Sequence, residues 1–411
     1  MPTVRPVAAP PAPPAPPAPP AADVPAHPAV GAATALLDAY RPGDRFLATP
    51  TRTVLARGPA TVVPDDGSPL PGRVRAALER ARSDGNDRPV VLGAVPFDTA
   101  APAALAVPEE VRTGPPLQAD PLVTLPADPP EALDWKVIEV PAPEEYARAT
   151  AAAVARMTAG EAEKVVLART LEVSAPGREP DLAALLGRLA RFDPSGHTFA
   201  LPVGPGRTLL GASPELLVAR RGGRLVANPL AGSAARSTDL AEDVRRAAAL
   251  LDSAKDLHEH AVVVEQVRRA MAPYCSSLEV PARPALVRTA TMWHLSTTVT
   301  GALADPDTTA LDVAVALHPT PAVCGTPTAA ARRMIADVEP FDRGFYTGML
   351  GWQDASGDGE WVVTLRCAEA VDGLLRLYAG AGVVPASDPL AETAETAAKF
   401  RTFLSAVGAS L

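Results

Sequence analysis

Cysteine is scarce in this chain of 411 residues: Cys275, Cys324 and Cys367 lie far apart, and none belongs to a CxxC pair. This scarcity excludes a disulfide framework, argues against a thiolate metal site and fits the reducing cytoplasm. Long apolar runs are also missing, since no segment reaches the roughly 18 apolar residues of a membrane-spanning helix. The N-terminus lacks the apolar core of a signal peptide. We therefore expect a soluble cytoplasmic protein without membrane contact.

Basic runs are missing as well. Lys and Arg number 38 against 47 Asp and Glu, which gives a formal net charge of −9. A chain of that charge without a basic patch is a poor partner for nucleic acid or an anionic membrane. An anionic substrate would need a local group of Arg, Lys, backbone N–H groups or metal to overcome the general field.

The first 30 residues lack the composition of a packed core. Twelve of them are Pro and nine are Ala, with PPAPPAPPAPP at 10–20. This predicts a disordered, partly polyproline tail over 1–30. Length alone would allow two or three domains. The hydrophobic content of 47% is enough to bury a large core.

Local patterns predict several elements in the rest of the chain. Residues 143–158 should form a helix with Pro at its first position, closed by Gly160. β-branched residues predict a strand over 164–173. Residues 33–130 read as a mixture of helix and strand. Short strands separated by Gly-rich turns over 198–230 predict an antiparallel meander.

Two helices are predicted over 238–273, the second opened by a capping box of Ser253 and Asp256. There is no regular alternation of strand and helix and no internal repeat, which disfavours Rossmann and TIM-barrel architectures. We therefore predict an α+β protein with large antiparallel sheets. Its later strands are expected at 289–300, 349–353, 360–368 and 374–381.

The C-terminal region joins a Gly-rich segment, GAGVVP at 380–385, to a helix-favouring one. On that helix Glu392, Glu395 and Lys399 fall within about 60° of one face. Such a face can hold Mg²⁺ through carboxylate while the lysine meets an anionic substrate. The alternative is a solvated helix with a Glu395–Lys399 pair. The glycines are no dinucleotide fingerprint, because Pro385 stands at the third glycine position, and they indicate a close ligand approach or a β-bulge.

The HEH sequence at 258–260 suggests zinc but does not fit it. The HExxH motif would need histidine at Val262, and alternate residues of a helix point in different directions, so His258 and His260 cannot share a metal. Glu259 lies one turn after Lys255. The segment alone predicts an ion pair between Lys255 and Glu259.

Together these segments resemble the chorismate-utilising enzymes, and within them the isochorismate synthases of catecholate siderophore biosynthesis. The resemblance runs from about residue 140 to the end, with the motifs in the family's order. It implies a single chorismate-binding catalytic domain over 31–411, with large antiparallel sheets packed as a sandwich and flanked by helices. The matching segments are KVVLAR at 164–169, GASPELL at 211–217, PLAGSAAR at 229–236, KDLHEH at 255–260, WHLST at 293–297, LHPTPAVCGTP at 317–327, EPFDRGFYTGMLGW at 339–352, VVTLRCA at 362–368 and AGAGVVPASDPLAETAETAAK at 379–399.

The resemblance implies a Mg²⁺-dependent reaction in which the C4 hydroxyl of chorismate leaves as a nucleophile enters at C2. Lys164 matches the general base and Glu215 the general acid. Burial beside Leu216 and Leu217 should raise the pKa of Glu215 enough to keep its proton. The implied Mg²⁺ ligands are Glu259 and Glu395, with Glu392 nearby. The implied substrate-binding residues are Gly232, His294, Ala322, Val323, Arg366, Tyr378, Gly380, Gly382 and Lys399. For His294, a satisfied core residue is the alternative.

The subfamily depends on fewer residues. Ammonia-using relatives carry glutamine at the position of Lys164, so lysine favours water as nucleophile, and no glutaminase subunit is expected. Salicylate synthases share the lysine but show a threonine-containing variant where this chain has 321–323. We therefore expect isochorismate as the product of a monomeric enzyme. The alternatives are a salicylate synthase, a menaquinone-pathway isochorismate synthase or a non-catalytic chorismate-binding regulator.

Overall fold

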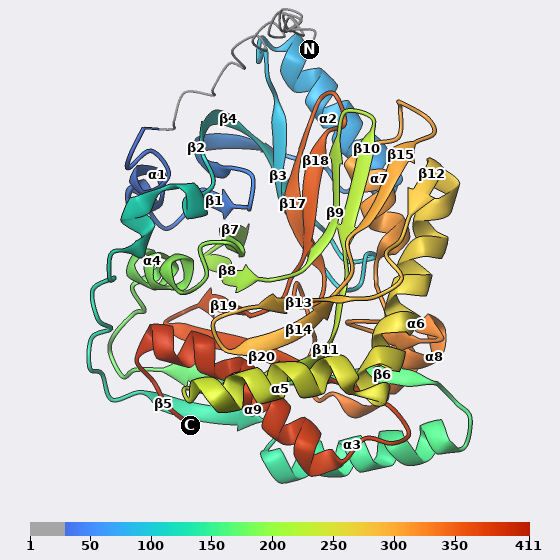
Figure 1. The fold of residues 1–411 in the computed structure, drawn as a ribbon. Helices are drawn as coiled ribbons and strands as arrows, with labels where there is room; N and C mark the ends of the chain where they lie inside the picture. Colours follow the sequence, from blue (N-terminus) through green and yellow to red (C-terminus); the bar gives the residue numbers. More distant parts are fainter. Residues whose placement is uncertain (1–28) are drawn as a thin grey trace, which may run out of the picture.

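The computed structural model describes residues 29–411, so all but the last two residues of the predicted tail lie outside the described range. Within this range a curled 17-stranded sheet and a three-stranded sheet are flanked by helices (Figure 1). The strand pairings are antiparallel. The predicted α+β class is confirmed. No helix within residues 29–411 is long and apolar enough to cross a membrane.

The helices are, in chain order, α1 (Thr34–Ala39), α2 (Leu70–Ser83), α3 (Pro143–Thr158), α4 (Leu182–Phe192), α5 (Leu240–Asp252), α6 (Ala254–Met271), α7 (Ala310–Leu317), α8 (Thr328–Val338) and α9 (Pro389–Val407). Short 3₁₀ turns lie at Leu117–Ala119, Pro121–Thr124 and Ala272–Tyr274.

The strands are β1 (Arg45–Ala48), β2 (Thr53–Val62), β3 (Val90–Val95), β4 (Ala104–Gly114), β5 (Lys136–Val140), β6 (Lys164–Ser174), β7 (His197–Gly204), β8 (Arg207–Ser213), β9 (Leu216–Arg221), β10 (Arg224–Asn228), β11 (Leu230–Ala235), β12 (Cys275–Glu279), β13 (Ala285–Arg288), β14 (Met292–Ser296), β15 (Val299–Leu303), β16 (Gly325–Thr326), β17 (Met349–Asp354), β18 (Gly359–Val363), β19 (Cys367–Val371) and β20 (Leu374–Val383).

Helices whose ends carry strong local signals form as predicted. α3 has the predicted bounds, with Pro143 at its first position and Gly160 at φ 88° just after its end. The Ser253 hydroxyl caps α6 by accepting the Asp256 N–H at 3.2 Å. The predicted capping box is only half formed, because the Ser253 N–H bonds to the Leu250 carbonyl and the Asp256 carboxylate contacts the Ser253 hydroxyl.

The predicted meander over 198–230 is wrong. Strands β7 and β8 form one hairpin and β9 and β10 another, but β8 pairs with β19 whereas β9 pairs with β18. Strand β8 ends just before Pro214, which has no N–H to donate to a neighbouring strand. The predicted strand over 360–368 breaks at the same level into β18 and β19, beside Arg366 at φ 47°. These two breaks separate the hairpins.

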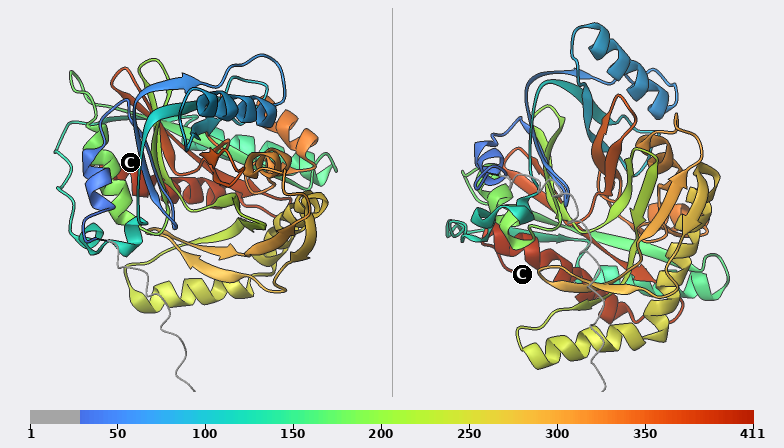
Figure 2. Two further views of the ribbon diagram at one scale, coloured as in Figure 1. Left: turned by 90° about the horizontal axis from the view of Figure 1, so that it is seen from above. Right: turned by 45° about the horizontal axis from the view of Figure 1, so that its top comes forward.

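The predicted strand over 289–300 is likewise two strands. β14 belongs to the three-stranded sheet with β11 and β13, whereas β15 pairs with β10 and β12 in the large sheet. Figure 2 shows α5 on the outer side of this small sheet. The small sheet therefore brings segments around 232 and 294 close to the breaks in the large one.

Strands β6 and β20 pair over ten residues, from Val165 opposite Val383 to Ser174 opposite Leu374. Helix α9 follows β20 closely: its N-cap Asp388 accepts the Ala391 N–H, and Gly408 ends it at φ 85°. α9 packs on β20 and on α3. Two of the segments that carry the family resemblance, 164–169 and 379–399, thus lie side by side.

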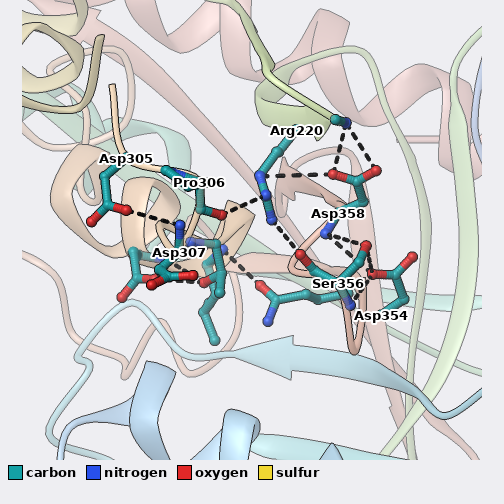
Figure 3. Close-up of polar contacts among 12 residues, drawn as sticks. Arg220, Asp305, Pro306, Asp307, Asp354, Ser356 and Asp358 are labelled. Carbon is teal, nitrogen blue, oxygen red and sulfur yellow. Dashed lines mark hydrogen bonds and ion pairs between the residues drawn. The ribbon is translucent and has the colours of Figure 1, made fainter. Parts of the chain in front are cut away.

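A buried arginine on β9 links the turn end of the β9–β10 hairpin to neighbouring loops (Figure 3). Arg220, 6% exposed, donates to the Ser356 carbonyl at 2.6 Å and the Pro306 carbonyl at 2.8 Å. The Asp358 carboxylate accepts the Gly222 N–H at 2.9 Å. These bonds join the β17–β18 turn to the loop before α7, and none of these residues lines the pocket described next.

Candidate active site

One pocket gathers almost every residue that the sequence singled out. It lies at the breaks of the large sheet and is walled by α6, α9, β11, β14 and β20. Of the predicted site residues, Lys164 alone is absent from its lining. Those that line it are Glu215, Gly232, Glu259, His294, Ala322, Val323, Arg366, Tyr378, Gly380, Gly382, Glu392, Glu395 and Lys399.

Glu215 follows Pro214 at the break between β8 and β9 and is 3% exposed. Its backbone is pinned on both sides: its N–H donates to the Ser213 hydroxyl at 3.3 Å, and its carbonyl accepts the Val363 N–H at 3.1 Å. Its carboxyl accepts the Leu230 N–H at 3.4 Å. Burial raises the pKa of Glu215 to about 8, so this carboxyl holds a proton at neutral pH, as expected from the sequence.

Lys164 lies behind the pocket wall rather than on it. It is 3% exposed, and its Nζ lies 2.8 Å from Glu259 Oε1. Glycine at 382 makes this contact possible, since a Cβ there would lie 2.7 Å from Glu259 Oε1 and 3.2 Å from Lys164 Cε. The β20 glycines thus mark close approach of side chains. The β-bulge alternative is wrong, because the β6–β20 register is regular.

Two further carboxylates in the pocket also pair with lysines. Glu392 lies 3.3 Å from Lys255, and Glu395 lies 2.7 Å from Lys399, the predicted pair on α9. The predicted Lys255–Glu259 ion pair is wrong. Glu259 turns inward to the buried Lys164, whereas Lys255, with its side chain 45% exposed, reaches across to α9.

The carboxylates of the pocket fit a hard divalent cation by their chemistry. Asp256, Glu259, Glu392 and Glu395 all line it. Burial, and then the charge of Glu395, raises the pKa of Glu392, and a bound cation would favour the ionised form of this carboxyl. As the side chains stand, no three such groups within residues 29–411 surround a single point, and Glu259, Glu392 and Glu395 each pair with a lysine. Binding of an ion would require these carboxylates to turn.

The pocket also contains cationic groups. Arg366 is partly exposed as a residue, but burial of its guanidinium lowers its pKa to about 10, and one buried terminal nitrogen of that group has no hydrogen-bond partner among the described residues. Lys399 donates to the Gly380 carbonyl at 2.7 Å. A buried guanidinium with unused donors suits a carboxylate ligand.

Two backbone N–H groups also face this space. On β6, the Ala168 N–H donates to the Glu339 carboxylate and the Val166 N–H donates to the Cys324 carbonyl, so neither N–H bonds to β20. The β20 residues opposite them therefore occupy positions of the antiparallel pair that do not hydrogen bond to β6. Those partners are Gly380 and Gly382. Their N–H groups consequently point away from β6, toward the side of β20 where the Gly380 carbonyl meets Lys399.

His294 is buried on β14 with one ring nitrogen fixed and the other unused. Its Nδ1 lies 2.9 Å from the Ser233 hydroxyl, whereas Nε2 has no partner among the described residues. Burial, then Arg366 and Lys399, lowers the pKa of His294 well below its ordinary value, so the ring is neutral. The alternative of a fully satisfied core histidine is wrong.

Several pocket residues escaped sequence reasoning. Tyr346 stacks on Tyr378 with ring centroids 5.0 Å apart, and a Cβ at Gly380 would lie 2.8 Å from the Tyr346 hydroxyl. Ser233 and Asp256 also line the pocket. Tyr346 lies within the matching segment 339–352 and Ser233 within 229–236, so the family resemblance was the one available signal. Gly232, at φ 78° in the irregular part of β11, is where the backbone bends into the pocket.

Comparison with known proteins extends these observations. The profile of the family described as "Chorismate binding enzyme" matches residues 120–408. Isochorismate synthase DhbC of Bacillus subtilis is 53% identical over 388 residues, which cover 92% of this chain and 96% of that protein. The vibriobactin-specific isochorismate synthase of Vibrio cholerae is 44% identical over 342 residues, covering 83% of this chain and 85% of that protein.

Solved structures give the same picture. The structure of DhbC from Bacillus anthracis superposes with a TM-score of 0.85 at 47% identity, covering 92% of this chain and 99% of its own. MenF, the menaquinone-specific isochorismate synthase of Escherichia coli, superposes with a TM-score of 0.76 at 24% identity, covering 91% of each chain, which shows the shared fold alone. The similarity therefore spans nearly the whole chain.

Proposed function

The chain belongs to the family of chorismate binding enzymes, and we propose that it works as an isochorismate synthase, an isomerase that converts chorismate to isochorismate. The observation that carries the proposal is the near full-length similarity to isochorismate synthases. The pocket supports it, because it combines a protonated carboxyl with a buried, incompletely paired guanidinium. The product would feed synthesis of 2,3-dihydroxybenzoate and catecholate siderophores.

Substrate binding follows from the charges of the pocket. Chorismate carries two carboxylates, and the Arg366 guanidinium together with the N–H groups of Gly380 and Gly382 would receive one of them. His294 lines the same pocket, and its unused Nε2 would hydrogen bond to a polar group of the ring. Magnesium, held by Glu259 and Glu395 with Glu392 nearby, would neutralise the ring carboxylate when bound.

The reaction requires one group that donates a proton to the departing oxygen and another that accepts a proton from the attacking water. Glu215 would donate its proton to the C4 oxygen as the C4–O bond breaks, which burial of its carboxyl makes possible at neutral pH. Lys164 would take a proton from the water whose oxygen bonds to C2. Its contact with Glu259 has to open for this role. One water is added and one is lost, so substrate and product are isomers.

Incubating the purified chain with chorismate and Mg²⁺ is expected to give chiefly isochorismate in equilibrium with chorismate, because water is the nucleophile that lysine suits. Chromatography of the products distinguishes the alternatives directly. Salicylate as the main product at neutral pH would identify a salicylate synthase. No conversion at all, with chorismate still bound, would indicate a regulator.

Activity is also expected to depend strictly on a divalent cation, since the proposed ligands are carboxylates. Chelation should abolish turnover, and added Mg²⁺ should restore it. Replacing Glu259 or Glu395 by Ala should raise the Mg²⁺ concentration needed for half-maximal rate. Glu265→Ala, an exposed acid on the same helix as Glu259, is the matched control and should leave that concentration unchanged. Full activity in excess chelator would rule out the metal site.

We further propose that residues 31–411 act as a single catalytic domain without an ammonia-supplying subunit, and as a monomer. The purified chain alone should then suffice for turnover. Light scattering during size-exclusion chromatography would reveal an oligomer.

A further inference from the structure

A buried arginine lies directly behind the acidic helix of the pocket. Arg169 is 1% exposed and stands on β6, five residues after Lys164 and therefore on the other face of that strand. Its charged partner is Glu139 on β5. The rings of Tyr146 on α3 and Phe400 on α9 flank its guanidinium at 5.9 and 5.5 Å. The guanidinium thus lies where two strands and two helices meet.

The guanidinium also contacts the backbone and one side chain of α9. Its Nε donates to the Thr396 hydroxyl at 2.8 Å, and a terminal nitrogen lies 3.5 Å from the Thr393 carbonyl. The Thr396 hydroxyl in turn donates to the Thr393 carbonyl at 2.7 Å. A cation and a hydroxyl therefore converge on one carbonyl, in the turn that carries the pocket acids.

The pocket acids on α9 are sequence neighbours of the residues that Arg169 contacts. Glu392 precedes Thr393 and Glu395 precedes Thr396, so each acid lies about 100° around the helix axis from the threonine that follows it. A small rotation or shift of α9 would move both carboxylates together. Magnesium is sensitive to such a shift, because it requires near-ideal octahedral geometry at about 2.0–2.1 Å.

We propose that Arg169 is a positioning residue: by holding Thr396 and the Thr393 carbonyl, it sets the rotation of α9 and so places the carboxylates of Glu392 and Glu395 for a divalent cation. This inference rests on the metal-dependent function proposed above. Arg169 touches neither substrate nor ion and acts only through the helix. A purely structural arginine would affect folding stability without affecting metal affinity in particular.

The test is a pair of isosteric substitutions on one helix. Thr396→Val removes the hydroxyl that Arg169 grips, whereas Thr393→Val removes only a hydroxyl bonded to the Pro389 carbonyl at 2.8 Å. Binding of Mn²⁺ alone is followed by the electron paramagnetic resonance of the free ion, and Mg²⁺ affinity by competition. Thr396→Val and Arg169→Lys should each weaken Mg²⁺ binding about tenfold, the usual effect of disturbing groups behind a metal ligand. Thr393→Val should stay within about twofold.

Kinetics and melting temperature complete the test. Thr396→Val should raise the Mg²⁺ concentration for half-maximal rate, with the rate at saturating Mg²⁺ nearly unchanged. Unchanged affinity in Thr396→Val, or equal losses in both valine variants with equal falls in melting temperature, would overturn the proposal. Parent enzyme that makes isochorismate but binds no Mn²⁺ would overturn it together with the metal site. Parent enzyme that binds Mn²⁺ but makes no isochorismate would overturn the function, and the contrast between the valine variants would still support Arg169.

Discussion

Replacing Glu215 by Gln is expected to lower turnover roughly 10²–10⁴-fold, the usual contribution of a general acid. The amide can donate a hydrogen bond, but it is too weak an acid to transfer a proton to the departing C4 oxygen. Its oxygen can still accept the Leu230 N–H, and the backbone bonds to Ser213 and Val363 do not involve the side chain. The fold and chorismate binding should therefore persist.

The pH dependence of the parent enzyme provides a second measurement of the same group. Because the pKa of Glu215 is about 8, the carboxyl is protonated below that pH and loses its proton above it. Turnover should fall as pH rises through about 8, and the residual activity of Glu215→Gln should not show this decline.

A matched control is Glu369→Gln, which changes a buried carboxylate paired with Arg207 outside the pocket. Its turnover should stay close to that of the parent. Turnover of Glu215→Gln within a few-fold of the parent would remove Glu215 from the mechanism.

Replacing Lys164 by Ala or Gln is expected to suppress isochorismate formation by roughly 10²–10⁴-fold, because neither side chain can accept a proton from water at neutral pH. Gln is the more informative change. Its amide can still donate to Glu259, which Ala leaves without a partner at the 2.8 Å contact. Chorismate binding and Mg²⁺ binding should be largely retained in the Gln variant.

Lys136→Ala, an exposed lysine on the neighbouring strand β5, is the control and should keep full activity. Ammonium supplied to the parent enzyme should yield no aminated product. Anthranilate or an aminodeoxychorismate would contradict the role of Lys164, as would near-normal isochorismate formation by Lys164→Gln.

Helices and strands whose ends are set by residues nearby in the sequence could be predicted from the sequence. Helix α3 begins at Pro143 and ends before Gly160 because those residues restrict their own backbone dihedral angles. Strand β6 and the helix after the Gly-rich segment followed from composition in the same way. The pairing between strands was harder to predict from the sequence. The hairpins β7–β8 and β9–β10 were expected, but their separation depends on pairing with β19 and β18, which lie more than 100 residues later in the chain.

The candidate site divides along the same line. The sequence by itself determined which residue types are present and in which segments, since the motif order and the acids at 215, 259, 392 and 395 can be read without coordinates. Only the tertiary structure decided which acids Lys164 and Lys255 meet. Lys164 reaches Glu259, and Lys255 reaches Glu392 rather than its own helical neighbour. The physical reason is that a pair four residues apart on an exposed helix is worth only about 0.2–0.5 kcal/mol, whereas a buried charge without a partner is far more costly. Burial is set by the packing of distant elements, and it therefore overrides the local preference.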